Sequence, residues 1–89
     1  MTQKLTFAQV NRPHAVYRLY DKDRTLLYIG CSHDPKRRLK KLREKWPWAK
    51  DVVDQVWEWY PSWSPAILAE GKAIWTEQPK YNQHLDGNR

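Results

Sequence analysis

Basic side chains are concentrated in one short segment of the chain. Residues 36–45 hold seven Lys and Arg residues, and Glu44 is the one local counter-charge. A cluster of this kind attracts phosphate backbones and predicts binding that weakens as salt is added. A solvated helix face is the alternative interpretation. The residues expected to bind nucleic acid in this way are Lys36, Arg37, Lys40, Lys41, Arg43 and Lys45.

Arg38 lies in the same segment, but its position relative to the apolar side of the expected helix differs from that of Arg37. Leu39, Leu42 and Trp46 are spaced by three and four residues, which predicts one apolar stripe of a helix. Arg38 falls at the border of that stripe, whereas Arg37 falls on an all-charged row that faces solvent. An arginine at such a border can be held in a fixed geometry, which suits bidentate recognition of a phosphoryl group.

Glu70 is a carboxylate in an otherwise apolar helical row that includes Ile67 and Ile74. A buried charge without compensation is costly, so Glu70 must be paired, protonated or bound to a metal, or else reach solvent from the border of the row. Glu77 shares this face, and periodicity does not separate the two carboxylates. The neighbouring Gly71 costs the helix about 1 kcal/mol relative to alanine, which suggests a close approach of another backbone segment.

Other site chemistries have less support. His14, His33 and His84 are widely spaced and contain no pair at helical spacing, so a histidine metal site is not expected. Cys31 is the single cysteine and cannot form an intrachain disulfide. With only the near neighbour His33 beside it, it is also a poor candidate for a nucleophile with a base.

Composition narrows the class of protein. Eighty-nine residues are enough for one small domain, and a net charge of +6 favours polyanionic partners. The six tryptophans suit either a small aromatic core or stacking on unpaired bases. No apolar run is long enough to span a membrane, and the first ten residues lack the apolar core of a signal peptide, so we expect a cytoplasmic protein.

The elements that must position these side chains follow from the local pattern. Apolar runs at residues 15–20 and 25–30 flank a charged turn and predict a β-hairpin. The turn lacks an Asn-Gly or Asp-Gly pair, so a loop longer than two residues is expected. Residues 53–60 are rich in Val, Trp and Tyr and predict a third strand.

One Asp-Pro pair and one Ser-Pro pair predict where two helices begin. Asp34 as N-cap with Pro35 at the first position predicts a helix that Pro47 ends. The pair at 64–65 predicts a second helix, which runs to about residue 77. The order β-β-α-β-α predicts an α+β domain. We expect this domain over residues 14–84, with tails at 1–13 and 85–89.

Taken together, these features resemble the GIY-YIG nuclease superfamily, especially the nuclease domain of the bacterial nucleotide-excision-repair endonuclease. The resemblance covers about residues 15–82. Ala15 stands where the family's first motif has glycine, and Leu42 stands where some members have His or Tyr. The matching residues, in chain order, are Ala15-Val16-Tyr17, Tyr28-Ile29-Gly30, Arg38, Glu70 and Pro79-Lys80-Tyr81-Asn82.

The resemblance implies a metal-dependent phosphodiesterase on a three-stranded antiparallel sheet flanked by helices. It implies that Glu70 holds one Mg²⁺ or Mn²⁺ and that Tyr17 and Tyr28 lie beside the scissile phosphate. Tyr17 is the expected general base or water-orienting group, Arg38 the clamp on the phosphoryl oxygens, and Asn82 the residue that completes the site. Since a phenol is a poor base at neutral pH, we expect the arginine and the metal to lower its pKa.

The leading hypothesis is therefore a stand-alone endonuclease that cuts DNA with structure-dependent or low sequence specificity. RNA stays open as a substrate, and a homodimer or a protein partner is the expected source of any specificity. One alternative is a nucleic-acid-binding module of the same fold with weak or no cleavage. Another is a tryptophan-rich interaction subunit, which exposure of Trp46, Trp48, Trp59 and Trp63 would favour.

Overall fold

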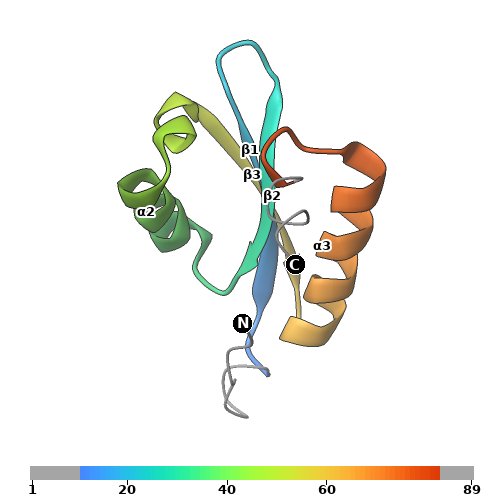
Figure 1. Ribbon diagram of the computed structural model, residues 1–89. Helices are drawn as coiled ribbons and strands as arrows, with labels where there is room; N and C mark the ends of the chain where they lie inside the picture. Colours follow the sequence, from blue (N-terminus) through green and yellow to red (C-terminus); the bar gives the residue numbers. More distant parts are fainter. Residues whose placement is uncertain (1–10, 83–89) are drawn as a thin grey trace.

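The computed structural model describes residues 11–82, which form one sheet between two helices (Figure 1). The three strands are antiparallel and lie in the order β2-β1-β3. This architecture confirms the predicted α+β fold. The predicted tails, 1–13 and 85–89, lie almost wholly outside the described residues and stay predictions. The elements are β1 (His14–Tyr20), β2 (Leu26–Ser32), α2 (Pro35–Lys45), the 3-10 segment η1 (Pro47–Asp51), β3 (Asp54–Tyr60) and α3 (Trp63–Glu77).

The loop between β1 and β2 has five residues, as the missing Asn-Gly signal predicted. The Oδ1 atom of Asp21 accepts hydrogen bonds from the amides of Asp23 and Thr25, each at 2.9 Å. Arg24 adopts the left-handed conformation, with φ of 66°. Its guanidinium pairs with Asp54 on β3 at 2.9 Å, so the loop is tied to the neighbouring strand.

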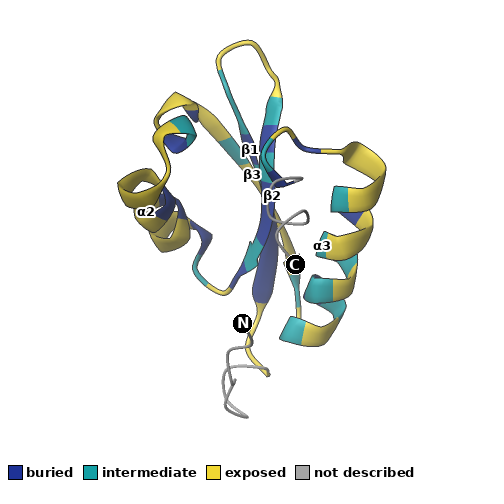
Figure 2. Cartoon of the chain, viewed as in Figure 1, coloured by how far each residue is buried: buried dark blue, intermediate teal, exposed yellow. Residues whose placement is uncertain are grey.

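Each helix covers one face of the sheet, and the buried residues lie where helix and sheet meet (Figures 1 and 2). Strand alternation divides the apolar residues of β1 and β2 between these two faces, except that a register irregularity opposite Leu19 and Tyr20 interrupts the alternation at Leu27. On the α2 face, Tyr17, Leu19 and Leu27 pack with Leu39, Leu42, Ala49 and Val52. On the α3 face, Val16 and Ile29 pack with Ala66 and Ala73.

The two helix starts differ in how well the sequence predicted them. Asp34 caps α2 as expected, since its side chain accepts from the Arg37 amide at 3.1 Å. The prediction for α3 was wrong by two residues: Ser62, rather than Ser64, is the N-cap. The amides of the first helical turn have no intrahelical acceptor, so Pro65 fits at the third helical position without loss of a hydrogen bond.

Two further features correct the sequence analysis. Gly71 is exposed, and a Cβ added there would meet no atom of residues 11–82 within 4 Å, so the predicted close approach of another backbone segment was wrong. The segment η1 was not predicted, because a single 3-10 turn has too few residues to show a period. No helix among residues 11–82 has the length and apolar character needed to cross a bilayer.

Candidate active site

Two phenols from neighbouring strands form the centre of the candidate site. Tyr17 is opposite Gly30 in the β1–β2 ladder, and a Cβ built at Gly30 would overlap the Tyr17 ring. Tyr17 is only 1% exposed, whereas Tyr28 is half-buried. The two ring centroids are 6.1 Å apart. A glycine is therefore required at position 30, because the Tyr17 side chain occupies the space of any larger residue.

An aromatic stack holds Tyr28 from its other side. The Tyr28 and Trp48 ring centroids are 5.3 Å apart, and those of Trp48 and Tyr81 are 4.8 Å apart with nearly parallel planes. Trp48 comes from η1 and Tyr81 from the segment after α3. The sequence offered no signal for Trp48 as a support of the site, because its place depends on how η1 folds back over the sheet.

A cation and an anion act on both phenols from two different helices. Burial is the largest cause of a raised pKa at Tyr17, followed by the charge of Tyr28; Arg38 lowers that pKa and Glu70 raises it. At Tyr28, burial and then Glu70 raise the pKa, and Arg38 opposes them. The structure thus brings together Tyr17, Tyr28, Arg38 and Glu70. The net shift is upward, so Arg38 by itself does not produce the lowered tyrosine pKa expected from the sequence.

Glu70 and Glu77, which helical periodicity did not distinguish, have different surroundings in the structure. Glu77 is held by Arg18 of β1, with Nε to Oε1 at 2.9 Å and Nη2 to Oε2 at 2.7 Å. These hydrogen bonds hold the pKa of Glu77 below its ordinary value. Glu70 is half-buried and acts electrostatically on the phenols instead. Glu77 therefore ties α3 to the sheet, and Glu70 is the carboxylate at the candidate site.

Asn82 is bonded to the backbone of β2. Its Oδ1 accepts from the Ile29 amide at 2.7 Å, and its Nδ2 donates to the Ile29 carbonyl at 2.8 Å. The side chain is 3% exposed. The amides of Lys80 and Tyr81 also donate to β2 carbonyls. Asn82 thus anchors the segment after α3 to the strand position between Tyr28 and Gly30.

Cys31 lies near the same charges but is a poor nucleophile. Burial, and then the charge of Glu70, raise the pKa of the thiol to about 12, although Arg38 lowers it. A thiol with this pKa stays protonated at neutral pH, and the thiolate is the reactive form. The ring of His33 packs against the ring of His14, with centroids 5.8 Å apart.

The six predicted nucleic-acid-binding residues are all exposed on α2. Arg43 also has a structural role, because its Nη2 donates to the Val52 carbonyl at 2.8 Å and its Nε to the Ala49 carbonyl at 3.3 Å. Arg37 and Lys41 line a small depression of about 80 Å³ together with Arg38. Cationic side chains therefore extend from Arg38 onto the outer surface of α2.

The donor set around Glu70 fits a hard divalent cation. Among residues 11–82, no three His, Cys, Asp or Glu side chains cluster as a ready-made metal cage. A cation at Glu70 would thus have one protein carboxylate, with water and substrate oxygens as its other ligands. Mg²⁺ favours this arrangement, because it keeps several waters and is usually bound by one or two carboxylates and phosphate oxygens.

Comparison with known families identifies the domain. A family model described as the GIY-YIG catalytic domain matches residues 13–82. The matched region includes every strand and helix described above and all five residues predicted to be catalytic. No curated protein shows significant similarity to the chain.

Proposed function

The chain belongs to the GIY-YIG catalytic domain family, a family of endonucleases that act on DNA, and from this premise we propose that it hydrolyses phosphodiester bonds in DNA. The observation that carries the proposal is the meeting of two phenols, a guanidinium and a carboxylate at one place. These groups lie far apart along the chain and come from two strands and two helices. The proposed cofactor is Mg²⁺ or Mn²⁺, held by Glu70.

Arg38 and the phenols are the groups we assign to the phosphate. The guanidinium of Arg38 presents parallel N–H donors that match two phosphoryl oxygens, and it stabilises negative charge as the bond to the leaving oxygen breaks. Tyr17, whose pKa is raised by burial, is a neutral phenol at neutral pH and orients the attacking water through its hydroxyl group. Each positive charge brought beside Tyr17 lowers its pKa and so raises the fraction present as phenolate, the form that can accept a proton.

A divalent cation bound at Glu70 supplies Lewis-acid stabilisation of the negative charge on the phosphoryl and leaving oxygens. Glu70 itself provides the negative charge that attracts the cation. Asn82 acts through the strand: by holding the backbone of Ile29, it sets the position of Tyr28 and the close passage of Tyr17 over Gly30. We therefore assign Asn82 a positioning role rather than direct contact with the phosphate.

The test is a plasmid-nicking assay with the full chain and added Mg²⁺ or Mn²⁺. We expect Glu70→Gln to lower the cleavage rate by about a hundredfold or more, as for loss of one charged group that stabilises a transition state. Binding of DNA by this variant is expected to persist, because the basic residues of α2 are unchanged.

Glu77→Gln is the matched control, because it removes the same charge from the same helix face while leaving Glu70 in place. This variant should cleave at close to the wild-type rate. If wild-type protein and Glu70→Gln cut equally well, the cleavage comes from a contaminant and the proposed function fails.

A further inference from the structure

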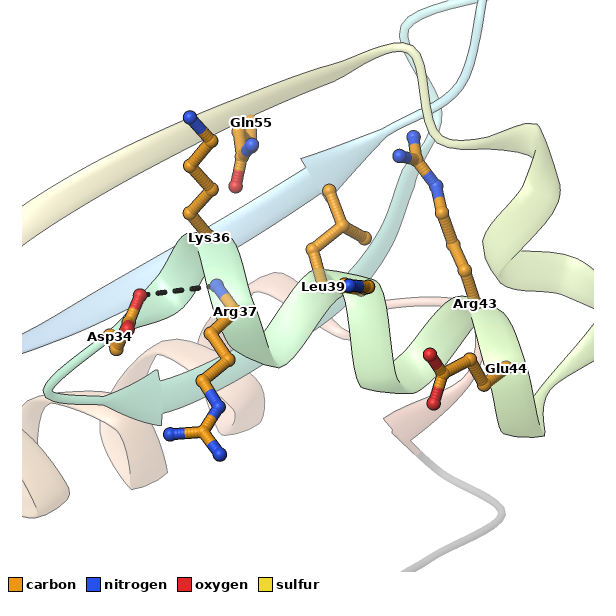
Figure 3. A pocket seen from close by; sticks show the side chains of 8 residues that line it. Asp34, Lys36, Arg37, Leu39, Arg43, Glu44 and Gln55 are labelled. Atoms are coloured by element: carbon orange, nitrogen blue, oxygen red, sulfur yellow. Dashed lines mark hydrogen bonds between the residues drawn. The ribbon is translucent and has the colours of Figure 1, made fainter.

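A basic groove of about 650 Å³ lies between α2 and β3. In Figure 3, Lys36 and Arg43 extend from α2 toward the side on which Gln55 of β3 lies, whereas Arg37 points away from it. Lys40 also lines the groove, so four cations outnumber the two carboxylates there. One of those carboxylates, Asp34, is already bound to a helix amide. We call this feature the α2–β3 groove.

Two exposed tryptophans lie beside the α2–β3 groove, on β3 beyond Gln55. Side chains alternate along a strand, so Trp57 and Trp59 share a face with Gln55. Trp57 is opposite Tyr17 in the β1–β3 ladder, which places this face on the α2 side of the sheet. The Trp57 Nε1 donates to the Gln55 Oε1 at 2.8 Å, and the two indole rings meet edge to face at 6.4 Å.

These tryptophans are exposed large apolar side chains in the described part of the chain. Trp57 is 40% exposed and Trp59 is 51% exposed. Within residues 11–82, the helix α2 packs mainly against β2 and η1 rather than against β3. Trp48 and Trp63 are half-buried, so the tryptophan excess seen in the sequence divides into packing residues and surface residues.

The α2–β3 groove is also connected to the candidate active site. Asp34 and Arg37 line both the groove and the small depression that includes Arg38. A polyanion that follows the cations of α2 can therefore pass from the exposed tryptophans to the guanidinium of Arg38.

We propose that the α2–β3 groove binds an unpaired DNA strand, with its phosphates along Lys36 and Lys40 and its bases stacked on Trp57 and Trp59. The inference rests on the proposed nuclease function and gives it a substrate class: DNA with an unpaired segment beside the bond that is cut. A cationic groove with aromatic side chains along it is the combination that holds single strands without sequence readout. A second copy of this chain, which also carries +6, is a poor occupant of a cationic groove.

Binding is measured with divalent cations chelated, so that cleavage plays no part. The probes are a fluorescent oligothymidine and an oligonucleotide of the same length whose internal residues are abasic. The proteins are the full-length wild type, Trp57→Ala, Trp59→Ala and the control Trp75→Ala. Trp75 is 78% exposed on α3, so it matches the change in residue type at a site away from the groove. Circular dichroism verifies that each variant is folded.

We expect Trp57→Ala and Trp59→Ala each to weaken oligothymidine binding about tenfold, the effect of losing one base–aromatic stack. Both should bind the abasic strand as wild type does, because it keeps the phosphates and lacks the bases. Trp75→Ala should stay within about twofold of wild type for both probes. Lys40→Gln should weaken binding of the two probes by the same factor, because it removes a phosphate contact only.

The inference is overturned if the Trp57 and Trp59 variants bind oligothymidine as tightly as wild type, or if they lose equal affinity for both probes. It is also overturned if these substitutions change the oligomeric mass in sedimentation while leaving strand binding unchanged, since the tryptophans would then form a protein–protein surface. These readouts do not depend on catalysis. If the protein does not cleave DNA but binds bases through Trp57 and Trp59, only the nuclease proposal is wrong. If it cleaves DNA but its binding does not depend on these tryptophans, only this inference is wrong.

Discussion

The passage of the Tyr17 ring over Gly30 is the most constrained contact of the candidate site. It removes all room for a side chain on β2 and keeps the Tyr17 phenol almost fully buried. Burial explains why the pKa of Tyr17 is raised despite the nearby Arg38 guanidinium. The glycine thus sets where the phenol of the candidate site lies.

Replacing Gly30 on β2 and Gly71 on α3 by alanine should change the free energy of unfolding in opposite directions. Gly30→Ala places a methyl group in the Tyr17 ring and should lower the free energy of unfolding by about 1–3 kcal/mol. Gly71→Ala fills open space on an exposed helix and should raise it by about 0.5–1 kcal/mol. Urea unfolding followed by tryptophan fluorescence measures both, and a shift of the same sign in the two variants would contradict the assignment.

Neighbouring arginines on α2 should differ in their effect on turnover. Arg38 acts on both phenols, whereas Arg37 points outward from the helix. We expect Arg38→Ala to reduce single-turnover cleavage about a hundredfold, as for removal of a donor to transition-state charge. Arg37→Ala should mainly weaken binding and leave the rate at saturating DNA near that of wild type. Equal losses of that rate would mean that the wrong arginine has been assigned to the phosphate.

At the scale of elements, one ion pair joins α3 to the centre of the sheet. Arg18 on β1 is the partner of Glu77 through two short hydrogen bonds and also approaches Glu58 of β3 at 3.4 Å. This arrangement connects three elements on the α3 side. It also leaves Glu70, two turns earlier on the same helix, to act on the two phenols.

This ion pair predicts a dependence of stability on pH. The pKa of Glu77 lies below its ordinary value of 4.5 because of the Arg18 hydrogen bonds. The stabilisation is therefore fully present above about pH 4.5 and is lost as pH falls through the lowered pKa. Near neutral pH, Glu77→Gln should be less stable than wild type by about 1 kcal/mol, the scale for a partly exposed bidentate pair. The gap should close in acid.

Urea unfolding at neutral and at acid pH measures the difference in stability between wild type and Glu77→Gln. The control variant is Glu44→Gln, on the exposed side of α2. Glu44→Gln removes a carboxylate of the same kind without breaking a hydrogen bond to Arg18. A gap between wild type and Glu77→Gln that stays constant from neutral to acid pH would show that the ion pair is not its cause.

At the scale of the whole molecule, the positive charge is distributed unevenly. The net charge is +6, and seven basic residues lie on the single helix α2. On the other side of the sheet, α3 has no basic residue in its last turn and presents exposed Leu68 and Trp75 instead. We therefore expect DNA to approach the α2 side of the sheet.

Affinity for duplex DNA should fall steeply with salt because binding releases counterions from the phosphates. If four phosphates are neutralised, the association constant should drop about a hundredfold between roughly 50 and 200 mM salt. Lys41→Gln on α2 should reduce the slope by about one contact, and Lys72→Gln on α3 should not change it. Fluorescence anisotropy titrations across salt concentrations measure the slope. A flat dependence would exclude the basic helix from the binding surface.

What the sequence alone could determine was local. The Asp34-Pro35 cap, the stop at Pro47 and the alternation of the hairpin strands act over a few neighbouring residues, so their elements were predicted from the pattern. The family resemblance added the candidate site residues, because it depends on residue types in order along the chain. The start of α3 was misjudged, because a proline is compatible with several positions of a first turn.

Only the tertiary structure decided the roles that depend on partners distant in the chain. Glu70 and Glu77 differ because Arg18 of β1 meets one of them, and Gly30 matters because Tyr17 crosses it from another strand. The exposure of Trp57 follows from where α2 sits on the sheet. Periodicity describes one element at a time, whereas each of these roles depends on how two or more elements pack.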